Sequence, residues 1–500
     1  MSRGPGEPAV GAVQARLICL VAEALNVAPE TISIKRPLRD YGFDSLASVT
    51  LTADLEDWLE RPVDPALVMD YPTIEAMAGF LATETNAAPV PVDVSPEHNH
   101  FELFPEYLAL LDRLDKLTRL GLANPFFKVH EGVARDTVVI DGHQLINFSS
   151  YNYLGMAGDP IVSRAAKAAI DMYGTSVSAS RIVAGERRLH RELEGELATL
   201  LGTEDCVVHV SGHATNVATM GYLLRPRPSD LILYDEHSHN SIIQGGLLSR
   251  AARRRFPHND WAALDTMLSS LRGRHERVLV ALEGAYSMEG DVPDLPRFIA
   301  VVKRHRAFLI VDEAHSIGVL GAHGGGIREH FKVDSDDVDL WMGTLSKAFA
   351  SCGGYIAGRH AVIKHLKYGA PGFMFSVGMS PPDAGAALAA IRLMRAEPAR
   401  VARLHANIRL FRDLARAHGL DTGTSGECAV VPLMVGGWTR CVALSEALFR
   451  RGISVLPVIP PAVADDAARL RFFVTSTHDD NQIRFTVATV AEELVRLARS

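Results

Sequence analysis

The first 80 residues show the apolar spacing of short amphipathic helices. Apolar side chains recur three and four positions apart in residues 11–25 and 45–59, and Pro72-Thr73 opens a further helical stretch. The pattern predicts a small all-α bundle, which we place at residues 8–84.

A change in composition marks the end of this bundle. Residues 85–97 contain three prolines and almost no bulky side chains, which is typical of an extended linker. A leucine stripe at helical spacing then stops at Gly121, a residue type that commonly ends helices. The stripe consists of Leu108, Leu111, Leu114, Leu117 and Leu120. We therefore assign residues 85–104 to a linker and residues 105–500 to a second domain.

From residue 140 onward, short apolar runs alternate with helical patterns. The apolar runs cover residues 206–210, 230–234, 277–283 and 308–313. The helical patterns between them include residues 187–201, 261–272 and 296–306. This alternation predicts an α/β fold with a mostly parallel sheet and helices on both faces. Ligands bind at the carboxyl ends of the strands in such sheets, so the polar residues that end these runs are candidates for a site.

The overall composition is typical of a globular protein. Of the 500 residues, 47% are hydrophobic and 22% are charged. The chain has no run of 18 apolar residues, and its start, MSRGPGEPAV, lacks the apolar core of a secretory signal. The five cysteines are scattered without a CxxC pair. We therefore expect a reduced, cytoplasmic protein of two or three domains without a membrane span.

The net charge of −8 is concentrated near the start of the chain. Residues 1–84 hold 13 acidic and 6 basic side chains, a net charge of −7, so the remainder is nearly neutral. This distribution argues against nucleic-acid binding, which requires a basic face. It favours an acidic module that docks on basic patches of its partners.

The segment RPLRDYGFDSLASVTL places Ser45 at the start of a predicted helix. One interpretation is that Asp44 or Ser45 caps this helix, as these residue types commonly do. The GFDSL motif within an acidic helical module also resembles that of acyl carrier proteins, over about residues 8–84. The resemblance implies that Ser45 carries a 4′-phosphopantetheine arm whose thiol holds an acyl group as a thioester. It also implies two partners, a phosphopantetheinyl transferase and an acyl-loading enzyme.

Two polar residues end apolar runs in the larger domain. FLIVDEAHSIG ends a run at Asp312, with His315 three residues later, and DLWMGTLSKAF supplies Lys347 after another run. A carboxylate facing the pyridine nitrogen of pyridoxal phosphate keeps that ring protonated, and a lysine can bind the same cofactor as a Schiff base. The alternatives are an ordinary polar strand end and a surface lysine. An Asp/His metal site is less well supported, because the chain has no HExxH motif or second ligand cluster.

The VSGHATN segment joins a predicted strand to a helix, whose first backbone amides suit a phosphate. His209 and His213 have a spacing that occurs in metal sites, but the Ser-Gly between them interrupts any continuous helix. His239, in DEHSHNS, offers a planar ring for stacking on the cofactor, although a single histidine is more often structural. We predict no metal.

Together these segments resemble the α-oxoamine synthases over about residues 105–500. This family includes 8-amino-7-oxononanoate synthase, serine palmitoyltransferase, 5-aminolevulinate synthase and 2-amino-3-ketobutyrate ligase. The motifs that carry the resemblance are INFSSYNYLG (146–155), GTSVSASRIVAGERRLHRELE (174–194), SGHATN (211–216), FPHND (256–260), EGAYSMEGD (283–291), VDEAHSIGVLG (311–321), GTLSKAF (343–349) and LRFFVTSTH (470–478). The resemblance implies fold type I of the pyridoxal-phosphate-dependent transferases, with a smaller C-terminal domain.

The resemblance also implies roles for residues that contact the ring of the cofactor. Lys347 matches the Schiff-base lysine, and Asp312 matches the partner of the pyridine nitrogen. His239 matches the stacking residue, which can assist proton transfer during condensation. His315 and Ser287 match contacts to the phenolic oxygen.

Further matches concern the phosphate and the amino acid. Gly212, His213 and Thr344 match residues near the cofactor and its phosphate. Ser376 matches a residue that reaches the phosphate of a neighbouring subunit, which implies a homodimer. Arg471 matches the arginine that holds the amino-acid carboxylate.

The family resemblance implies decarboxylative condensation of an amino acid with an acyl thioester, which gives an α-aminoketone. Tyr151 stands where many members that use coenzyme A esters have asparagine, and Ser180 stands where glycine-selective members have threonine. Alanine, serine and glycine therefore stay open as substrates. Two other functions also stay open: an aminotransferase or amino-acid decarboxylase of the same fold, and a non-catalytic carrier or assembly module.

Overall fold

The computed structural model describes residues 9–25, 27–41, 45–59, 61, 63, 67–83, 95–224, 227 and 229–499. The chain divides into two compact units, Met1–Leu110 and Leu111–Ser500. Within the described residues, no helix combines the length and the apolar character needed to cross a membrane. All five cysteines are free.

The first unit contains the small helical bundle that the apolar spacing predicts. Its main helices are α1 (Val10–Leu25), α2 (Ser45–Leu59), α3 (Leu67–Asp70) and α4 (Ile74–Thr83). Apolar side chains from α1, α2 and α4 form a core of their own, which includes Leu17, Leu55 and Met77. Each of these three side chains is fully buried, so the bundle has its own apolar interior.

The leucine stripe lies on α5 (Pro105–Arg119), and the boundary between the two units falls within this helix. The helix ends two residues before Gly121, whose φ of +67° suits glycine because it has no Cβ. Leu117 is buried, whereas Leu108 and Leu111 are exposed.

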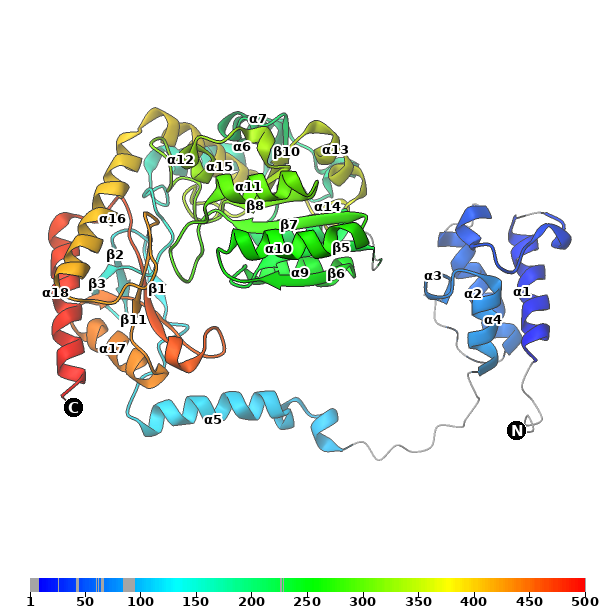
Figure 1. Ribbon diagram of the computed structural model, residues 1–500, viewed down its shortest axis with the longest axis horizontal. Coiled ribbons are helices and arrows are strands. Elements are labelled where there is room, and N and C mark those ends of the chain that lie inside the picture. Colours follow the sequence, from blue (N-terminus) through cyan, green and yellow to red (C-terminus); the bar gives the residue numbers. More distant parts are fainter. Residues whose placement is uncertain are drawn as a thin grey trace. The chain divides into compact units, whose positions relative to one another are not determined.

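The second unit is built around a seven-stranded sheet with helices along both faces, as the alternating pattern predicts (Figure 1). The strand order is β4-β10-β9-β8-β7-β5-β6. The strands are β4 (Asp205–His209), β5 (Asp230–Asp235), β6 (Ala252–Phe256), β7 (Arg277–Glu283), β8 (Phe308–Asp312), β9 (Leu340–Thr344) and β10 (Gly354–Gly358). β10 is antiparallel to both of its neighbours, and the other pairs are parallel.

The helices of this unit fill the intervals that the sequence predicts. They are α6 (Pro160–Tyr173), α7 (Arg188–Leu201), α8 (Gly212–Leu223), α9 (Asn240–Ser249), α10 (Trp261–Leu271), α11 (Leu295–Arg304), α12 (Gly326–Phe331), α13 (His360–Gly369), α14 (Pro371–Met374), α15 (Pro381–Ala396) and α16 (Ala399–Ala417). Asp260 and Asp294 cap α10 and α11, because each side chain accepts a hydrogen bond from a first-turn amide.

Two smaller sheets complete the second unit. β1 (His130–Glu131), β2 (Thr137–Ile140) and β3 (His143–Asn147) form one sheet with β12 (Ile453–Ser454). β11 (Val430–Met434), β14 (Arg469–Phe473) and β13 (Pro457–Val458) form the other, beside α17 (Trp438–Arg450) and α18 (Asp480–Leu497). The antiparallel pairing of β14 with β11 and β13 places Arg471 on a supported strand.

Candidate active site

Asp312 is the last residue of β8 and is almost completely buried. Its Oδ2 accepts a hydrogen bond of 2.8 Å from Asn216 Nδ2, and its Oδ1 accepts one of 2.9 Å from the Ala314 amide. Asn216 is a buried residue of α8, and its amide nitrogen also lies 2.9 Å from the Ser241 hydroxyl. These bonds fix the orientation of the carboxylate.

Lys347 lies just beyond the end of β9 and is half-buried. Its Nζ is 5.9 Å from the centre of the Tyr151 ring. Burial lowers the pKa of Lys347 to about 8, although Asp312 and Glu283 favour its charged form. Lys347 therefore lies within electrostatic range of Asp312.

Glu283 ends β7 and lies opposite Asp312 in the register of the neighbouring strands. It is buried, and its Oε1 accepts a hydrogen bond from the His239 amide. Burial, with the charge of Asp312, raises the pKa of Glu283 well above its usual value. The apolar pattern alone gave Glu283 no role, although it ends the predicted strand at 277–283.

His239 precedes α9 and caps it, because its Nδ1 accepts a hydrogen bond of 3.2 Å from the Ser241 amide. Burial lowers the pKa of His239, while Asp312 opposes this effect. The His213 ring lies edge-on to it, with 6.5 Å between the ring centres. His239 and His213 are therefore neighbours.

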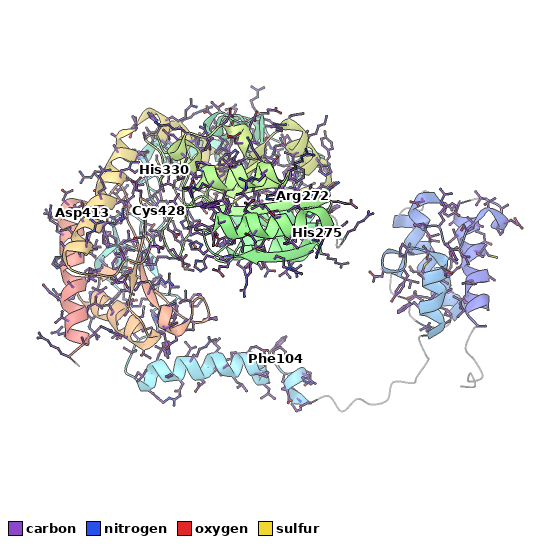
Figure 2. The ribbon with its side chains drawn as sticks, viewed as in Figure 1. Phe104, Arg272, His275, His330, Asp413 and Cys428 are labelled. Atoms are coloured by element: carbon purple, nitrogen blue, oxygen red, sulfur yellow. The ribbon has the colours of Figure 1, made fainter. Side chains whose placement is uncertain are left out.

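His315 is held by the buried side chain of Tyr153, a residue to which the sequence pattern had given no role. Its Nδ1 lies 2.8 Å from the hydroxyl of Tyr153, and both residues are buried. Burial raises the pKa of Tyr153 well above its usual value and lowers that of His315 well below its usual value, so both are neutral. The phenol can then donate to Nδ1, which leaves the imidazole proton on Nε2. Cys428, labelled in Figure 2, contacts the backbone of His315, with its Sγ 3.8 Å from the His315 carbonyl oxygen.

The start of α8 meets the end of β9. Ser211 caps the helix, and its Oγ accepts a hydrogen bond of 3.1 Å from the Ala214 amide. A Cβ on Gly212 would lie 2.9 Å from Thr344 Oγ1, so only glycine allows this close approach. Thr344 Oγ1 in turn lies 2.7 Å from Ser346 Oγ. First-turn amides and hydroxyl groups are therefore gathered at one point, an arrangement that suits an anion.

Arg471 approaches the same group of residues from β14. Its Nη1 donates to the Ser287 carbonyl oxygen at 3.0 Å, and its buried Nε has no partner among the described residues. Its charge lowers the pKa values of Lys347 and His315, although burial is the larger cause for both. Arg471 therefore lies within electrostatic range of Lys347 and His315.

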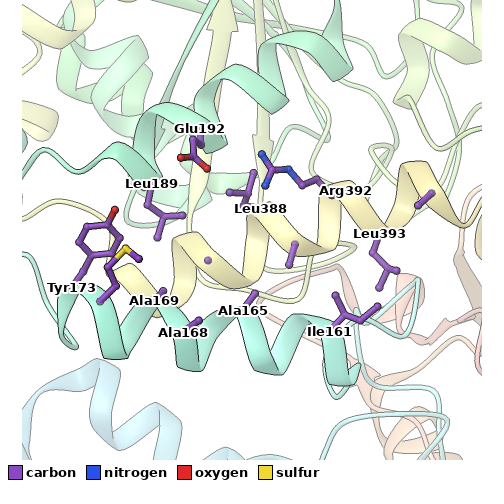
Figure 3. A pocket seen from close by; sticks show the side chains of 14 residues that line it. Ile161, Ala165, Ala168, Ala169, Tyr173, Leu189, Glu192, Leu388, Arg392 and Leu393 are labelled. Carbon is purple, nitrogen blue, oxygen red and sulfur yellow. The ribbon is translucent and has the colours of Figure 1, made fainter.

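A cavity of about 440 Å³ lies beside Lys347, and Tyr151, Asn152 and Ser346 line part of it. A larger apolar groove of about 560 Å³ runs between α6 and α15 (Figure 3). Alanine and leucine side chains dominate that groove, and it includes none of the polar strand-end residues described above. Of the predicted site residues, Lys347 lines the first cavity and none lines this groove.

Two predicted residues are not part of this group. No hydrogen bond or ion pair joins Ser376 to the other predicted site residues in the described part of the chain, and its Oγ donates to the Val377 carbonyl oxygen at 3.2 Å. Ser45 begins α2, but its side chain and residues 42–44 lie outside the described residues. Across the residues that are described, no cluster of three or more His, Cys, Asp or Glu side chains is arranged to hold a metal ion.

Comparison with known proteins agrees with this geometry. Residues 143–490 match the family "Aminotransferase class I and II", and residues 15–81 match "Phosphopantetheine attachment site". The 8-amino-7-oxononanoate synthase of Geobacter sulfurreducens is 37% identical over 77% of this chain and 97% of its own. The chain belongs to the α-oxoamine synthases.

Other relatives of the synthase are serine palmitoyltransferases. Serine palmitoyltransferase of Bacteriovorax stolpii is 33% identical over 73% of this chain and 86% of its own. The solved serine palmitoyltransferase of Sphingomonas wittichii superposes with a TM-score of 0.76 at 30% identity, over 79% of this chain and 99% of its own. The solved serine palmitoyltransferase of S. paucimobilis superposes with a TM-score of 0.75 at 29% identity, over 79% of this chain and 99% of its own. The fold is thus type I of the pyridoxal-phosphate-dependent transferases, as expected.

The synthase is a pyridoxal-phosphate-dependent acyltransferase, and its second cofactor is 4′-phosphopantetheine. The residues present fit pyridoxal phosphate. The anion-binding arrangement at Gly212 and Thr344 suits the phosphate, and the fixed carboxylate of Asp312 suits a protonated pyridine nitrogen. The general reaction is decarboxylative condensation of an amino acid with an acyl thioester.

Proposed function

We propose that the synthase draws its acyl group from its own carrier arm, attached to Ser45. In this proposal, residues 8–84 are the acyl carrier domain, residues 85–104 the linker and residues 105–500 the catalytic domain. The match of residues 15–81 to the phosphopantetheine-attachment family supports it. An acyl-loading enzyme and a phosphopantetheinyl transferase are then partners of the carrier domain.

The grouping of Lys347, Asp312 and Arg471 is the observation that carries the catalytic part of the proposal. Lys347 would hold the cofactor covalently, Asp312 would pair with its pyridine nitrogen and His239 would stack on its ring. His315 would donate its Nε2 proton to the phenolic oxygen, beside Ser287.

Gly212 and His213, at the start of α8, would hold the phosphate of the cofactor together with Thr344. Ser376 would reach the phosphate in the second subunit of a homodimer. Its neighbours Phe375 and Val377 are exposed by 84% and 49% within one chain, which supports an interface there.

The bound cofactor supplies an electron sink for the negative charge that develops at the amino-acid α-carbon. When the amine of the amino acid takes the place of Lys347 on the cofactor, Lys347 would be released as a free amine. It can then remove the α-proton, and its lowered pKa makes the neutral amine available for this. Arg471 holds the carboxylate while the α-carbon forms a bond to the thioester carbonyl carbon and the thiol leaves. The carboxylate is then lost as carbon dioxide, and His239 or Lys347 returns a proton to the α-carbon. The product is an α-aminoketone.

The amino acid is alanine, serine or glycine. Serine palmitoyltransferases and 8-amino-7-oxononanoate synthases are both among the relatives, so the family leaves this choice open. The Tyr151 ring lies beside Lys347 in the cavity wall, where it can contact the substrate side chain or the acyl group.

Intact-protein mass spectrometry tests the carrier part of this proposal. We expect the full-length chain, expressed with a phosphopantetheinyl transferase, to gain the mass of the arm and then that of an acyl group. Ser45→Ala should gain neither, yet should still condense the amino acid with a free acyl thioester. An arm that persists in Ser45→Ala would contradict the assignment.

Absorption spectroscopy tests the catalytic part. Lys347→Ala should lose the visible band of the covalently bound cofactor and the condensation activity, because no other amine lies at that position. Lys364→Ala, a change of an exposed lysine on α13, is the matched control and should keep both. A retained band in Lys347→Ala would contradict the role of this lysine.

A further inference from the structure

Four arginines lie within six residues at the free edge of the seven-stranded sheet. Arg250 directly follows α9, and Arg253, Arg254 and Arg255 lie on β6, which is last in the strand order (Figure 1). Arg250, Arg254 and Arg255 are exposed, and Arg253 is half-buried. No carboxylate in the described parts of the chain forms an ion pair with any of the four. Their positive charge is therefore not neutralised locally.

Apolar side chains adjoin these charges. Leu247 and Leu248, in the last turn of α9, are exposed by 45% and 61%. We call Leu247, Leu248, Arg250, Arg254 and Arg255 the β6 patch. Exposed leucines with arginines around them are typical of a protein-binding surface, in which an apolar centre is surrounded by charge.

Charged side chains on an edge strand also prevent unwanted pairing with another sheet. Acidic and basic side chains both prevent such pairing. Protection of the edge strand also does not require exposed leucines nearby. All of the charged residues in the β6 patch are positive, so the patch also selects for an acidic partner.

The β6 patch lies close to the active site along α9. This helix starts at its cap His239, which belongs to the site, and ends beside Arg250. A helix of ten residues spans about 15 Å, because each residue adds about 1.5 Å. A partner on the patch therefore lies within one short helix length of the reacting groups.

The carrier segment has the opposite charge. Residues 1–84 hold 13 acidic and 6 basic side chains. On α2, which begins at Ser45, Glu56 and Asp57 are exposed and Asp54 is half-buried. A positive surface attracts such a domain over about 10 Å at moderate salt and raises the rate of encounter.

We propose that the β6 patch is the docking surface for an acidic acyl carrier domain. Docking there orients the carrier so that its arm delivers the acyl thioester to the active site. This inference rests on the proposed function, because it requires that the acyl donor be carrier-bound.

Two full-length variants test docking in trans. The donor chain carries Lys347→Ala, so it holds the acylated arm but cannot react. The acceptor chain carries Ser45→Ala, so it reacts but has no arm. We expect Arg254→Glu with Arg255→Glu in the acceptor chain to raise the apparent KM for the donor chain at least 10-fold. Added salt should also slow the reaction of this variant less than that of the unaltered acceptor, because fewer charges pair between the two chains.

A matched control has the same change in net charge elsewhere. Lys364→Glu with Arg409→Glu alters two exposed basic residues on α13 and α16, and it should leave the KM for the donor chain unchanged. Both acceptor variants should use a free acyl thioester like the unaltered acceptor, which shows that the catalytic domain is folded.

Three results would overturn the proposal. The first is an equal KM for the donor chain in the patch and control variants. The second is loss of DNA-oligonucleotide binding in the patch variant with normal use of the donor chain, which would make the patch a nucleic-acid surface. The third is failure of every acceptor to use the donor chain while the free thioester reacts. That result would contradict docking of a carrier in trans. If the unaltered chain also makes no product from its own acylated arm, the proposed carrier function is wrong as well.

Discussion

Lys347 illustrates how burial changes the chemistry of one residue. An ordinary lysine is almost wholly charged at neutral pH, whereas a pKa of about 8 leaves roughly one tenth of the amine neutral at pH 7. Asp312 and Glu283 limit the shift, because their charges favour the ammonium form. The residue is therefore tuned by the polar ends of two neighbouring strands.

At the residue scale, Asp312→Asn should separate cofactor binding from catalysis. The amide cannot keep the pyridine nitrogen protonated, so the electron sink is weakened while the covalent bond to Lys347 remains possible. We expect kcat to fall by about 100-fold or more, since loss of one preorganised electrostatic partner has effects of this order. Steady-state kinetics and the visible band of the cofactor measure the two effects.

Asp339→Asn is the control for this prediction. Asp339 directly precedes β9, where its Oδ2 accepts a hydrogen bond of 2.8 Å from the Leu309 amide, so it sits at the opposite end of the sheet from Asp312. This variant should keep its kcat even if its stability falls. Equal losses in the two variants would mean that Asp312 acts only through folding.

At the scale of elements, His258 connects the end of β5 with the loop after β7. Its Nδ1 lies 2.8 Å from Asp235 Oδ1, and its Nε2 lies 2.9 Å from Asp291 Oδ2. The same loop after β7 is also held by two arginines of β14. Arg469 Nη1 donates to Glu289 at 3.1 Å, and Arg471 donates to the Ser287 carbonyl oxygen. The segment that positions Arg471 is thus anchored by charged side chains from two sheets.

The pH dependence of stability tests this anchor. Burial lowers the pKa of His258, but the two carboxylates outweigh it and raise the pKa from 6.5 to about 10. Because the folded value is raised, the stabilisation is complete below pH 6.5 and is lost as the pH rises to about 10. The free energy of unfolding should fall by up to about 1.4 kcal/mol per pH unit in this window.

Chemical denaturation of the wild type and of His258→Gln measures this contribution. The difference between the two proteins should shrink between pH 6.5 and 10, because the glutamine does not titrate. His305→Gln removes a histidine that contacts a single carboxylate, with its Nε2 2.7 Å from Asp265, and it is the matched control for loss of a histidine. A difference for His258→Gln that stays constant with pH would contradict the raised pKa.

At the scale of the whole molecule, the chain combines two units with separate apolar cores. The helical bundle buries its own leucines, whereas the larger unit buries side chains along the central sheet. Residues 84–94, which directly follow α4, lie outside the described residues. Separate cores imply separate unfolding, because each unit loses its own buried surface.

Calorimetry should therefore show two transitions. Leu55→Ala removes a fully buried side chain from the bundle core and should destabilise that unit by about 2–5 kcal/mol. One transition should move to lower temperature and the other should stay in place. Leu309→Ala, in the buried strand β8, should do the reverse, whereas a single shared transition would contradict the independence of the units.

The amino-acid sequence by itself determined the strands, the helices and the polar residues that end them. Asp312 and Lys347 could be predicted because each follows an apolar run, and a local pattern of this kind is visible along the chain. The parallel sheet followed from the alternation of those runs with helical patterns. The tertiary structure then placed these strand ends side by side.

Only the tertiary structure decided which distant residues act together. Asn216 reaches Asp312, Tyr153 reaches His315, and Glu283 lies opposite Asp312, although each pair is separated by many residues in the chain. Sequence spacing does not encode such contacts, because they depend on strand order and on how side chains pack between layers. The pKa of Lys347 has the same origin, since burial and neighbouring charges exist only once the strands have assembled.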